Sequence, residues 1–355
     1  MRPSWVEVDL EAVRQNVRAL AKVIAPAKIC AVVKADGYGH GDVPVAEAAV
    51  EAGAWWLAVA LVEEGVRLRE AGIDAPILLL SEPPLTDATE VVRWNLTPTV
   101  YRQNFVEALV AAGADRVQVK VDTGMHRVGV APSALHALVE TCRSAGLTVE
   151  AIWTHFAVSE EVSDFTAAQI ATFNEAVAGL DVPSAHLANT AGGILHPEAR
   201  RDMVRVGIGM YGIHPGPATR SAVALRPAMR IVSRVGHVQR LAAGDRPSYG
   251  RRRALTEDSN VVTIPIGYAD GLPRGLSDRG EVLIGGHRHS LAGTVTMDQI
   301  VVDVGEMTVQ VGDEVVLIGR QGDEEITADE WADLLGTIAY EVVCQIGPRL
   351  PRRYA

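Results

Sequence analysis

Cysteine, long apolar runs and excess positive charge are all scarce in this sequence. Its 355 residues include only three cysteines, Cys30, Cys142 and Cys344, with no Cys-x-x-Cys pair. This scarcity argues against a disulfide framework or a zinc cluster and favours a reducing compartment. No apolar run reaches the length of a membrane span, and the N-terminus is charged before an export signal could form. We therefore expect a cytoplasmic protein without a metal site or a membrane partner.

The charge balance speaks against a nucleic-acid partner. Lysine and arginine number 33 against 44 aspartates and glutamates, which gives a formal net charge of -11. A protein that binds nucleic acid through phosphates needs a broad basic surface, and the arginine clusters at 251–253 and 352–353 are only local. With 48% hydrophobic residues, the chain can build one large domain and a smaller one.

Strand-like and helical segments alternate through the first part of the chain. The strand-like segments, eight in all, are Ile29–Val33, Trp56–Leu61, Pro76–Leu80, Thr97–Val100, Val117–Val121, Val149–Trp153, Ala185–Leu187 and Val204–Tyr211. Eight such units predict a (β/α)8 barrel over residues 9–225. A doubly wound sheet is the alternative, because Gly207–Gly212 reads Gly-x-Gly-x-x-Gly. That string falls late in the chain and opens no helix, so we discount it.

After about residue 225 the pattern changes to alternating β-branched segments separated by Gly and Asp turns. These segments are Arg230–Val235, Asn260–Ile266, Glu281–Ile284, Gln299–Val304 and Glu314–Ile318. They predict a mainly antiparallel β domain over residues 226–355, to which the N-terminal strand within residues 1–8 is added.

The stretch from Lys28 to Gly41 is the most informative of the chain. Its apolar run Ile29–Val33 is typical of a strand buried on both faces, and Lys34 follows directly. A buried lysine loses its proton easily, and its neutral amine can form a Schiff base with an aldehyde cofactor. An isolated lysine in this place would more often extend its charge into solvent. The surrounding residues favour the chemical role.

The string Ala-Val-Val-Lys-Ala-Asp-Gly-Tyr-Gly-His-Gly at residues 31–41 resembles the cofactor signature of bacterial alanine racemases of fold-type III. The resemblance covers the chain from Trp5 to Tyr354. It implies pyridoxal 5'-phosphate as the cofactor, bound to Lys34, and interconversion of L-alanine and D-alanine for peptidoglycan. It also implies a homodimer with shared active sites and a small amino acid as substrate.

The same resemblance assigns the residues around the cofactor. Phosphate ligands would be Tyr38, Asn189, Thr190, Gly207, Ile208 and Tyr354. Arg127 would contact the cofactor phenolate and the substrate carboxylate, and His155 would pack beside the pyridine ring. Arg205 would face the ring nitrogen. Because a guanidinium only donates hydrogen bonds, that nitrogen would stay unprotonated, which weakens the ring as an electron sink and suppresses transamination.

Lys120 lies in a segment whose valines share one strand face. Gln118, Lys120 and Asp122 therefore point to the other face, which we expect to be the barrel interior. An ammonium there would repel Arg127. Members of the resembled family carbamylate the equivalent lysine, and we expect the same modification of Lys120.

Racemisation needs a second base on the opposite face of the planar carbanion. The resemblance implies that Lys34 exchanges the proton on the D-alanine face and that Tyr249 of the partner subunit does so on the L-alanine face. It further implies that Tyr268 lines the entrance and that the backbone of Met297 touches the substrate.

Some positions depart from the family pattern and leave alternatives open. His126 stands where many members have glycine, and Thr296 stands where cysteine is common. A racemase for serine or another small amino acid, or one retained for antibiotic resistance, is the nearest alternative. A non-catalytic pyridoxal-phosphate carrier is disfavoured because such carriers are single barrels. A barrel decarboxylase is disfavoured because those enzymes place an acidic residue where this chain has Arg205.

Overall fold

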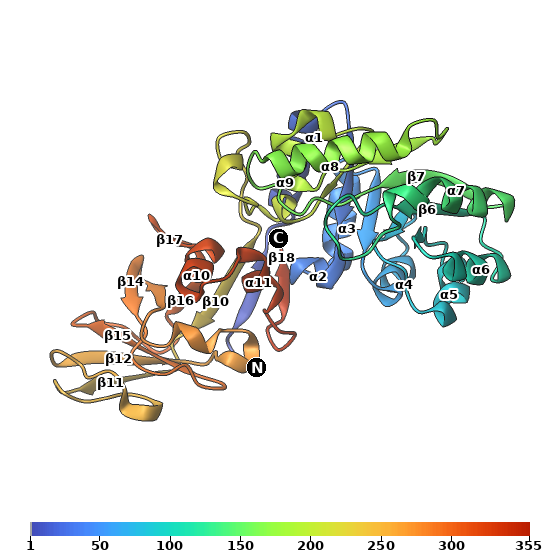
Figure 1. Ribbon diagram of the computed structural model, residues 1–355. Helices are drawn as coiled ribbons and strands as arrows, with labels where there is room; N and C mark the ends of the chain where they lie inside the picture. Colours follow the sequence, from blue (N-terminus) through green and yellow to red (C-terminus); the bar gives the residue numbers. More distant parts are fainter. Residues whose placement is uncertain (1) are drawn as a thin grey trace. The chain divides into compact units, whose positions relative to one another are not determined.

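The computed structural model describes residues 2–355, which form two compact units. The first, here called the barrel unit, comprises Glu11–Gly37 and Gly41–Arg226 (Figure 1). The second, the β unit, comprises the N-terminal segment up to Leu10, the short segment Tyr38–His40 and Pro227–Ala355. The assignment of Tyr38–His40 to the β unit was not foreseen, because nothing in its sequence distinguishes it from the flanking residues.

The barrel unit contains eight parallel strands. They are β2 (Lys28–Val32), β3 (Trp56–Val59), β4 (Ile77–Leu79), β5 (Thr99–Val100), β6 (Arg116–Lys120), β7 (Thr148–Trp153), β8 (Ser184–His186) and β9 (Met203–Val206). Two four-stranded sheets, β4-β3-β2-β9 and β5-β6-β7-β8, are joined by the parallel bridges Leu78–Thr97 and Asn189–Arg205. These bridges complete the ring, and the predicted (β/α)8 barrel is confirmed.

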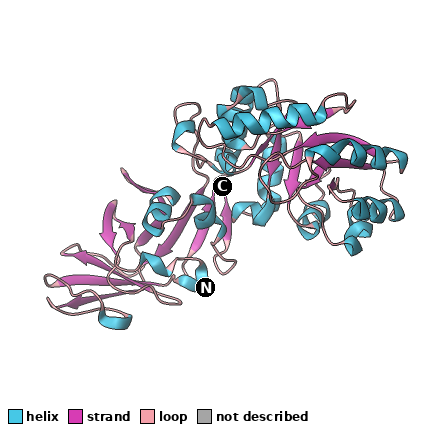
Figure 2. Ribbon diagram, in the orientation of Figure 1, coloured by secondary structure: helices cyan, strands magenta, loops and turns pink. Residues whose placement is uncertain are grey.

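Helices connect the strands of the barrel (Figure 2). They are α1 (Leu10–Ile24), α2 (Lys34–Tyr38), α3 (Asp42–Glu51), α4 (Val62–Glu70), α5 (Ala88–Arg93), α6 (Gln103–Ala111), α7 (Leu135–Ser144), α8 (Asp164–Val177) and α9 (Thr190–Leu195). In α1 the buried residues Val13, Val17 and Leu20 recur at helical spacing, so one face of the helix is apolar.

One predicted strand of the barrel is too long. The apolar segment Val204–Tyr211 was predicted as a single strand, but β9 ends at Val206 and Ile208–Tyr211 form a 3-10 helix, η4. Both parts are fully buried, so their apolar character is the same and gives no sign of the break. The break lies at Gly207, whose backbone is not extended.

The β unit contains the remaining strands. They are β1 (Trp5–Val8), β10 (Met229–Arg234), β11 (His237–Leu241), β12 (Ser259–Ile264), β13 (Glu281–Ile284), β14 (His287–Ser290), β15 (Ile300–Gly305), β16 (Glu314–Gln321), β17 (Glu324–Ile326) and β18 (Arg352–Tyr354). One sheet has the order β14-β13-β16-β10-β1-β18, with β17 beside β16, and the other has the order β11-β12-β15. All pairs are antiparallel except β1 with β18, which confirms the predicted antiparallel character.

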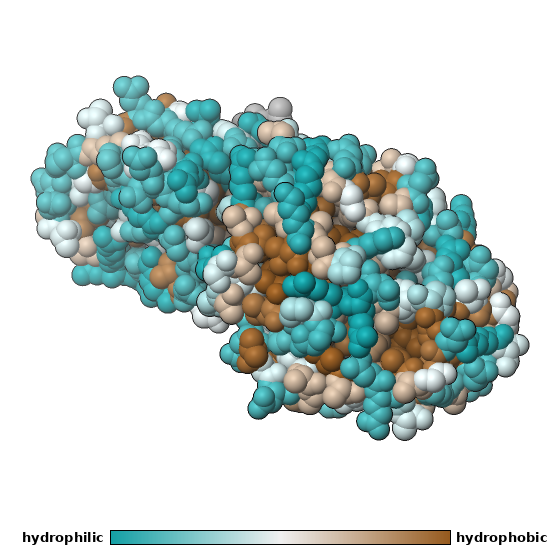
Figure 3. All heavy atoms as spheres, turned by 90° about the horizontal axis from the view of Figure 1, so that it is seen from above, coloured by the Kyte–Doolittle hydropathy of each residue, from teal (hydrophilic) through white to brown (hydrophobic). Residues whose placement is uncertain are grey.

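Two helices accompany these sheets, α10 (Ala328–Leu335) and α11 (Ala339–Cys344). The Thr327 hydroxyl accepts the N–H of Glu330, which begins α10. On the face drawn in Figure 3, hydrophilic residues predominate over the β unit and hydrophobic residues show in patches on the barrel unit. Within residues 2–355, none of the helices combines the length and the apolar character that a membrane crossing requires.

Gly39 provides a test of the packing of the Tyr38–His40 segment. Its φ is +79°, and an added Cβ would collide with the carbonyl oxygen of Val343 in α11. We expect Gly39→Ala to lower the free energy of unfolding by roughly 1–3 kcal/mol beyond the cost of the left-handed backbone. Gly312→Ala is the matched control in the same unit, because its φ is +98° and its Cβ would meet open space. Urea denaturation of both variants measures the difference; equal losses would show that Gly39 is not tightly packed.

Candidate active site

Lys34 begins a left-handed turn directly after the first barrel strand. Ala35, Asp36 and Gly37 have φ angles of 54°, 53° and 59°, which is an unfavourable conformation for the two residues with side chains. The turn is held by the Asp36 carboxylate, which accepts the N–H of Asp42 at 3.1 Å. The left-handed turn was not predicted from the sequence.

Glu64 of α4 also fixes this turn. Its carboxylate is buried and accepts the N–H of Ala35 at 2.7 Å through one oxygen. The other oxygen accepts the N–H groups of Ala60 and Leu61 at 2.8 and 3.1 Å. The lysine-bearing turn after β2 is thereby fastened to the end of β3.

Positive charge gathers around His155, which follows β7. Burial lowers the pKa of its imidazole well below the usual value, and the nearby charges of Arg205, Lys120, Arg127 and Lys34 lower it further. His155 is therefore uncharged at neutral pH. Lys34, Lys120 and His155 follow or end three different strands, β2, β6 and β7, and barrel enzymes place their catalytic groups at such strand ends.

Lys120, the last residue of β6, is almost fully buried. Burial, Arg205 and Arg127 together lower the pKa of its amine to about 7. Its nitrogen lies 4.5 Å from the ring centre of Trp153, and the Arg205 guanidinium lies 4.6 Å from the same ring. An aromatic face stabilises a neighbouring cation without contributing a negative charge. The sequence gave no sign of this role for Trp153.

Arg205 is buried and donates to uncharged acceptors. One terminal nitrogen donates to His186 Nδ1 at 2.6 Å, and the other donates to His155 Nδ1 at 3.2 Å. The remaining acceptors are the carbonyl oxygens of Thr154, His186 and Leu187. Burial lowers the pKa of Arg205 to about 10, so the group remains a cation at neutral pH.

The hydrogen bonds of Arg205 fix the tautomers of both histidines. A guanidinium cannot accept, so each Nδ1 must accept and each proton lies on Nε2. His186 then donates from Nε2 to the Gln118 side-chain oxygen at 2.9 Å. Gln118 was predicted to face the barrel interior, whereas His186 was overlooked because a lone histidine in a strand carries no motif. The Nε–H of Arg205 has no acceptor among residues 2–355.

Asn189, Thr190, Gly207 and Ile208 come together at the ends of β8 and β9. Asn189 begins α9, and its side-chain oxygen accepts the Gly192 N–H and the Ser159 hydroxyl, both at 2.9 Å. Thr190 accepts the N–H of Gly207 at 3.0 Å, and Ile208 begins η4 directly afterwards. The structure thus brings these four predicted phosphate ligands into one corner of the barrel unit.

The loop that carries Arg127 is organised by Asp122. Its carboxylate accepts the N–H groups of Gly124 and His126, each at 3.0 Å, and lies 3.2 Å from His126 Nδ1. Burial raises the pKa of Asp122, but these hydrogen bonds outweigh it and hold the pKa below its usual value. His126 has a φ of +53°. This conformation explains why glycine suits the position, and the two contacts to Asp122 compensate for the histidine.

Tyr249, Tyr268 and Met297 lie together in the β unit. They line a pocket of about 710 Å³ with Arg274, Thr294, Val295, Thr296, Asp298 and Gln299. Tyr249 is 74% exposed. The sequence predicted these three residues from separate segments, and the structure places them around one pocket.

Tyr38 and Tyr354 also lie in the β unit. The ring of Tyr38 is 6.2 Å from that of Tyr340 in α11, whereas Tyr354 is in β18 opposite Val8 of β1. Tyr340 was overlooked, because a tyrosine in a short helix has no distinguishing pattern. Tyr340 thus places a second tyrosine ring beside Tyr38.

Comparison with known proteins extends these observations. Solved structures of amino-acid racemases share this two-unit fold over the whole chain. The alanine racemase from E. faecalis has a TM-score of 0.95 and 36% identity, covering 100% of this chain and 98% of that one. The histidine racemase from Leuconostoc mesenteroides has a TM-score of 0.93 and 29% identity, with the same coverage.

The sequence comparisons define the family. Residues 8–215 match the alanine racemase N-terminal domain, and residues 228–354 match the alanine racemase C-terminal domain. An alanine racemase from Symbiobacterium thermophilum is 47% identical over 100% of this chain and 97% of its own length. The chain belongs to the alanine racemase family.

The role of Glu64 in holding the Lys34 turn can be tested directly. Glu64→Gln places an amide N–H against a backbone N–H, so at least one buried donor loses its acceptor. We expect a loss of about 1–3 kcal/mol in the free energy of unfolding. Glu63→Gln, at the exposed neighbouring position, is the control. An unfolding midpoint of Glu64→Gln equal to that of the control would contradict this role.

Proposed function

We propose that this chain interconverts L-alanine and D-alanine, the reaction that names its family, with pyridoxal 5'-phosphate as its cofactor. The observation that carries the cofactor assignment is the chemistry of the barrel site. Two guanidinium groups, those of Arg127 and Arg205, and two amines, those of Lys34 and Lys120, act on one uncharged imidazole. Such a site suits an anionic group that carries a phosphate and a phenolate, together with an amine that can bind its aldehyde.

Each predicted residue has a place in this proposal. Lys34 would hold the aldehyde carbon of the cofactor, and the corner formed by Asn189, Thr190, Gly207 and Ile208 would receive the phosphate. Tyr38 and Tyr354 would contribute their hydroxyls. When bound, pyridoxal phosphate would draw electrons from the α-carbon of the amino acid.

Arg205 and His155 would set the electronic state of the site. The free Nε–H of Arg205 would donate to the ring nitrogen, which then has to act as an acceptor and remain without a proton. His155 would pack beside the ring in its uncharged form. This arrangement favours return of the proton to the α-carbon over transfer of the amino group.

The proton transfers require two bases. Lys34 would remove or return the proton on the D-alanine face, and the hydroxyl of Tyr249 from the partner subunit on the L-alanine face. The exposure of Tyr249 in a single chain supports a role toward a partner. We therefore propose a homodimer with shared active sites, in which Arg127, Tyr268 and Met297 bind the substrate. We further propose that it acts in the cytoplasm and supplies D-alanine for peptidoglycan.

Another small amino acid is the second candidate substrate. The histidine racemase with the same fold shows that this architecture accommodates other substrates, although its identity to this chain is only 29%. Thr296, at the position where cysteine is common in the family, lines the β-unit pocket. The decay of circular dichroism with L-alanine, D-alanine, L-serine and L-histidine decides between them. We expect decay to zero from both alanine enantiomers, faster than from the others.

The two bases can be separated by substitution. Lys34→Ala should lose both the absorbance of the bound cofactor and racemisation. Tyr249→Phe should keep that absorbance but lose turnover by about 10²-fold or more, because a positioned acid-base group contributes on that order. In D2O, Tyr249→Phe should still exchange the α-proton of D-alanine, which contacts Lys34. Full turnover of Tyr249→Phe would refute the two-base assignment.

Carbamylation of Lys120 is a separate prediction. The neutral amine attacks CO2, forms an N–C bond and releases a proton, which leaves an anion beside Arg127. Because burial and neighbouring cations lower the pKa of Lys120 to about 7, the reactive amine is present above that pH and is lost below it. With 13C-bicarbonate at pH 8, we expect one protein-bound carbamate signal in NMR that fades on acidification through pH 7. Its persistence in Lys120→Arg would assign it to another residue.

A further inference from the structure

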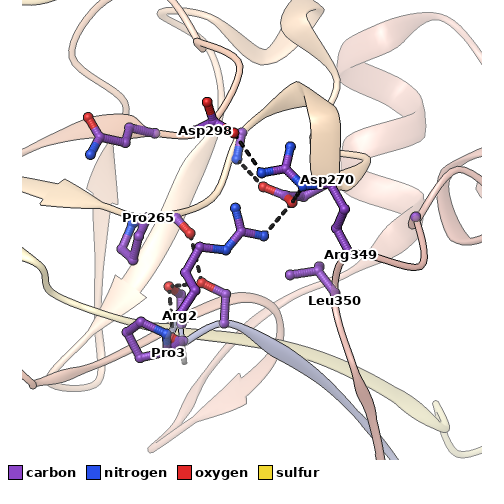
Figure 4. A network of polar contacts seen from close by, with 12 residues as sticks. Arg2, Pro3, Pro265, Asp270, Asp298, Arg349 and Leu350 are labelled. Atoms are coloured by element: carbon purple, nitrogen blue, oxygen red, sulfur yellow. Dashed lines mark hydrogen bonds and ion pairs between the residues drawn. The ribbon is translucent and has the colours of Figure 1, made fainter.

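Asp270 is a fully buried carboxylate in the 3-10 turn η7 (Tyr268–Asp270) of the β unit. One oxygen accepts the N–H of Gly267 at 2.9 Å. The other forms ion pairs with the guanidinium of Arg2 and, at 3.4 Å, with Nε of Arg349 (Figure 4). A buried charge of this kind is maintained only when its partners remain in place.

Arg349 connects this carboxylate to a second one. Its Nη2 lies 2.6 Å from Asp298, so a single guanidinium contacts both acids. Asp270 lies two residues after Tyr268, and Asp298 directly follows Met297. Arg349 therefore joins two of the chain segments that line the β-unit pocket. Two arginines and two aspartates also balance their charges.

The two segments touch through their backbones as well. The N–H groups of Tyr268 and Ala269 donate to the carbonyl oxygens of Thr296 and Met297, at 2.9 and 3.1 Å. Gly267 lies so close to these carbonyls that a Cβ would collide with them. Any shift of one segment is therefore transmitted to the other.

We propose that Arg349, with Asp270 and Asp298, is a positioning device that sets Tyr268 and Met297 at the distance that alanine requires. This inference rests on the proposed function, in which those two residues bind the substrate. Arg349 and Asp298 are 44% and 55% exposed at their side chains. Exposed ion pairs contribute little to the free energy of unfolding. We therefore expect loss of the Arg349–Asp298 pair to change the structure only locally.

Arg349→Lys tests the device, because one ammonium keeps the charge but replaces the planar fork that spans both carboxylates. We expect KM for both alanine enantiomers to rise about tenfold with kcat within about threefold, as for a lost positioning contact that spares the reacting groups. Arg288→Lys is the matched control. Arg288 also contacts several carboxylates of the β unit, those of Glu281, Glu324 and Glu330, but it does not line the pocket.

A second measurement does not depend on activity or on the cofactor. Hydrogen exchange followed by mass spectrometry should show faster exchange of the Tyr268 and Ala269 amides in cofactor-free Arg349→Lys than in Arg288→Lys, at an equal unfolding temperature. Asp298→Asn should give the same local change. Combined with Arg349→Lys it should add little, because both act on one contact. Asp298→Asn alone keeps the test valid if Arg349→Lys does not fold.

The outcomes separate this proposal from the proposed function. An unchanged KM together with unchanged exchange in Arg349→Lys or Asp298→Asn would overturn the positioning role and leave racemisation intact. An equal rise of KM in the Arg288→Lys control would also overturn it, since the effect would not be specific. Faster local exchange in a protein that racemises no amino acid would support the device and refute the proposed function instead.

Discussion

The structure of the barrel site depends on one buried cation, Arg205, which forms no ion pair with any described carboxylate. Its acceptors are backbone carbonyls and two uncharged imidazoles, and an aromatic ring supports its flat face. Burial lowers the pKa of both His155 and Lys120, and the charge of Arg205, which no neighbouring carboxylate cancels, lowers both further. Burial and one side chain together thus keep the neighbouring imidazole uncharged.

Carboxylates have a different task in this protein, which is to hold backbone N–H groups. Such charge-assisted hydrogen bonds are stronger than those to neutral acceptors, so they can maintain turns that the backbone alone would not favour. Each fixes a segment that carries a proposed site residue: Glu64 next to Lys34, Asp122 next to Arg127 and Asp270 next to Tyr268. Negative charge therefore stabilises the loops, while positive charge dominates the barrel site.

The sequence predicted most of the fold because its strands are apolar and separated by regular intervals. Prediction of secondary structure failed at Gly207, because the strand before it and the 3-10 helix after it are equally buried. It also missed the strands His237–Leu241 and His287–Ser290, which are largely exposed. The proposed site residues were assigned through motifs that resemble those of the alanine racemase family, and their roles stay predictions. His186, Trp153 and Tyr340 were not predicted, since each depends on neighbours that are distant in the chain. The left-handed turn after Lys34 was also hidden, because Ala35 and Asp36 are ordinary residues that adopt this conformation under tertiary constraint.

The pairing of β1 with β10 and β18 has a consequence for synthesis of the chain. β1 is made before the barrel strands, yet its partners begin only at Met229 and Arg352, after the last barrel strand. The barrel unit, in contrast, draws its strands from Lys28 to Val206 and can close while the ribosome is still translating the rest. β1 must therefore remain without a strand partner until β10 has been made, and its pairing with β18 comes later still. Closure of the barrel can therefore precede completion of the sheet that contains β1 and β18.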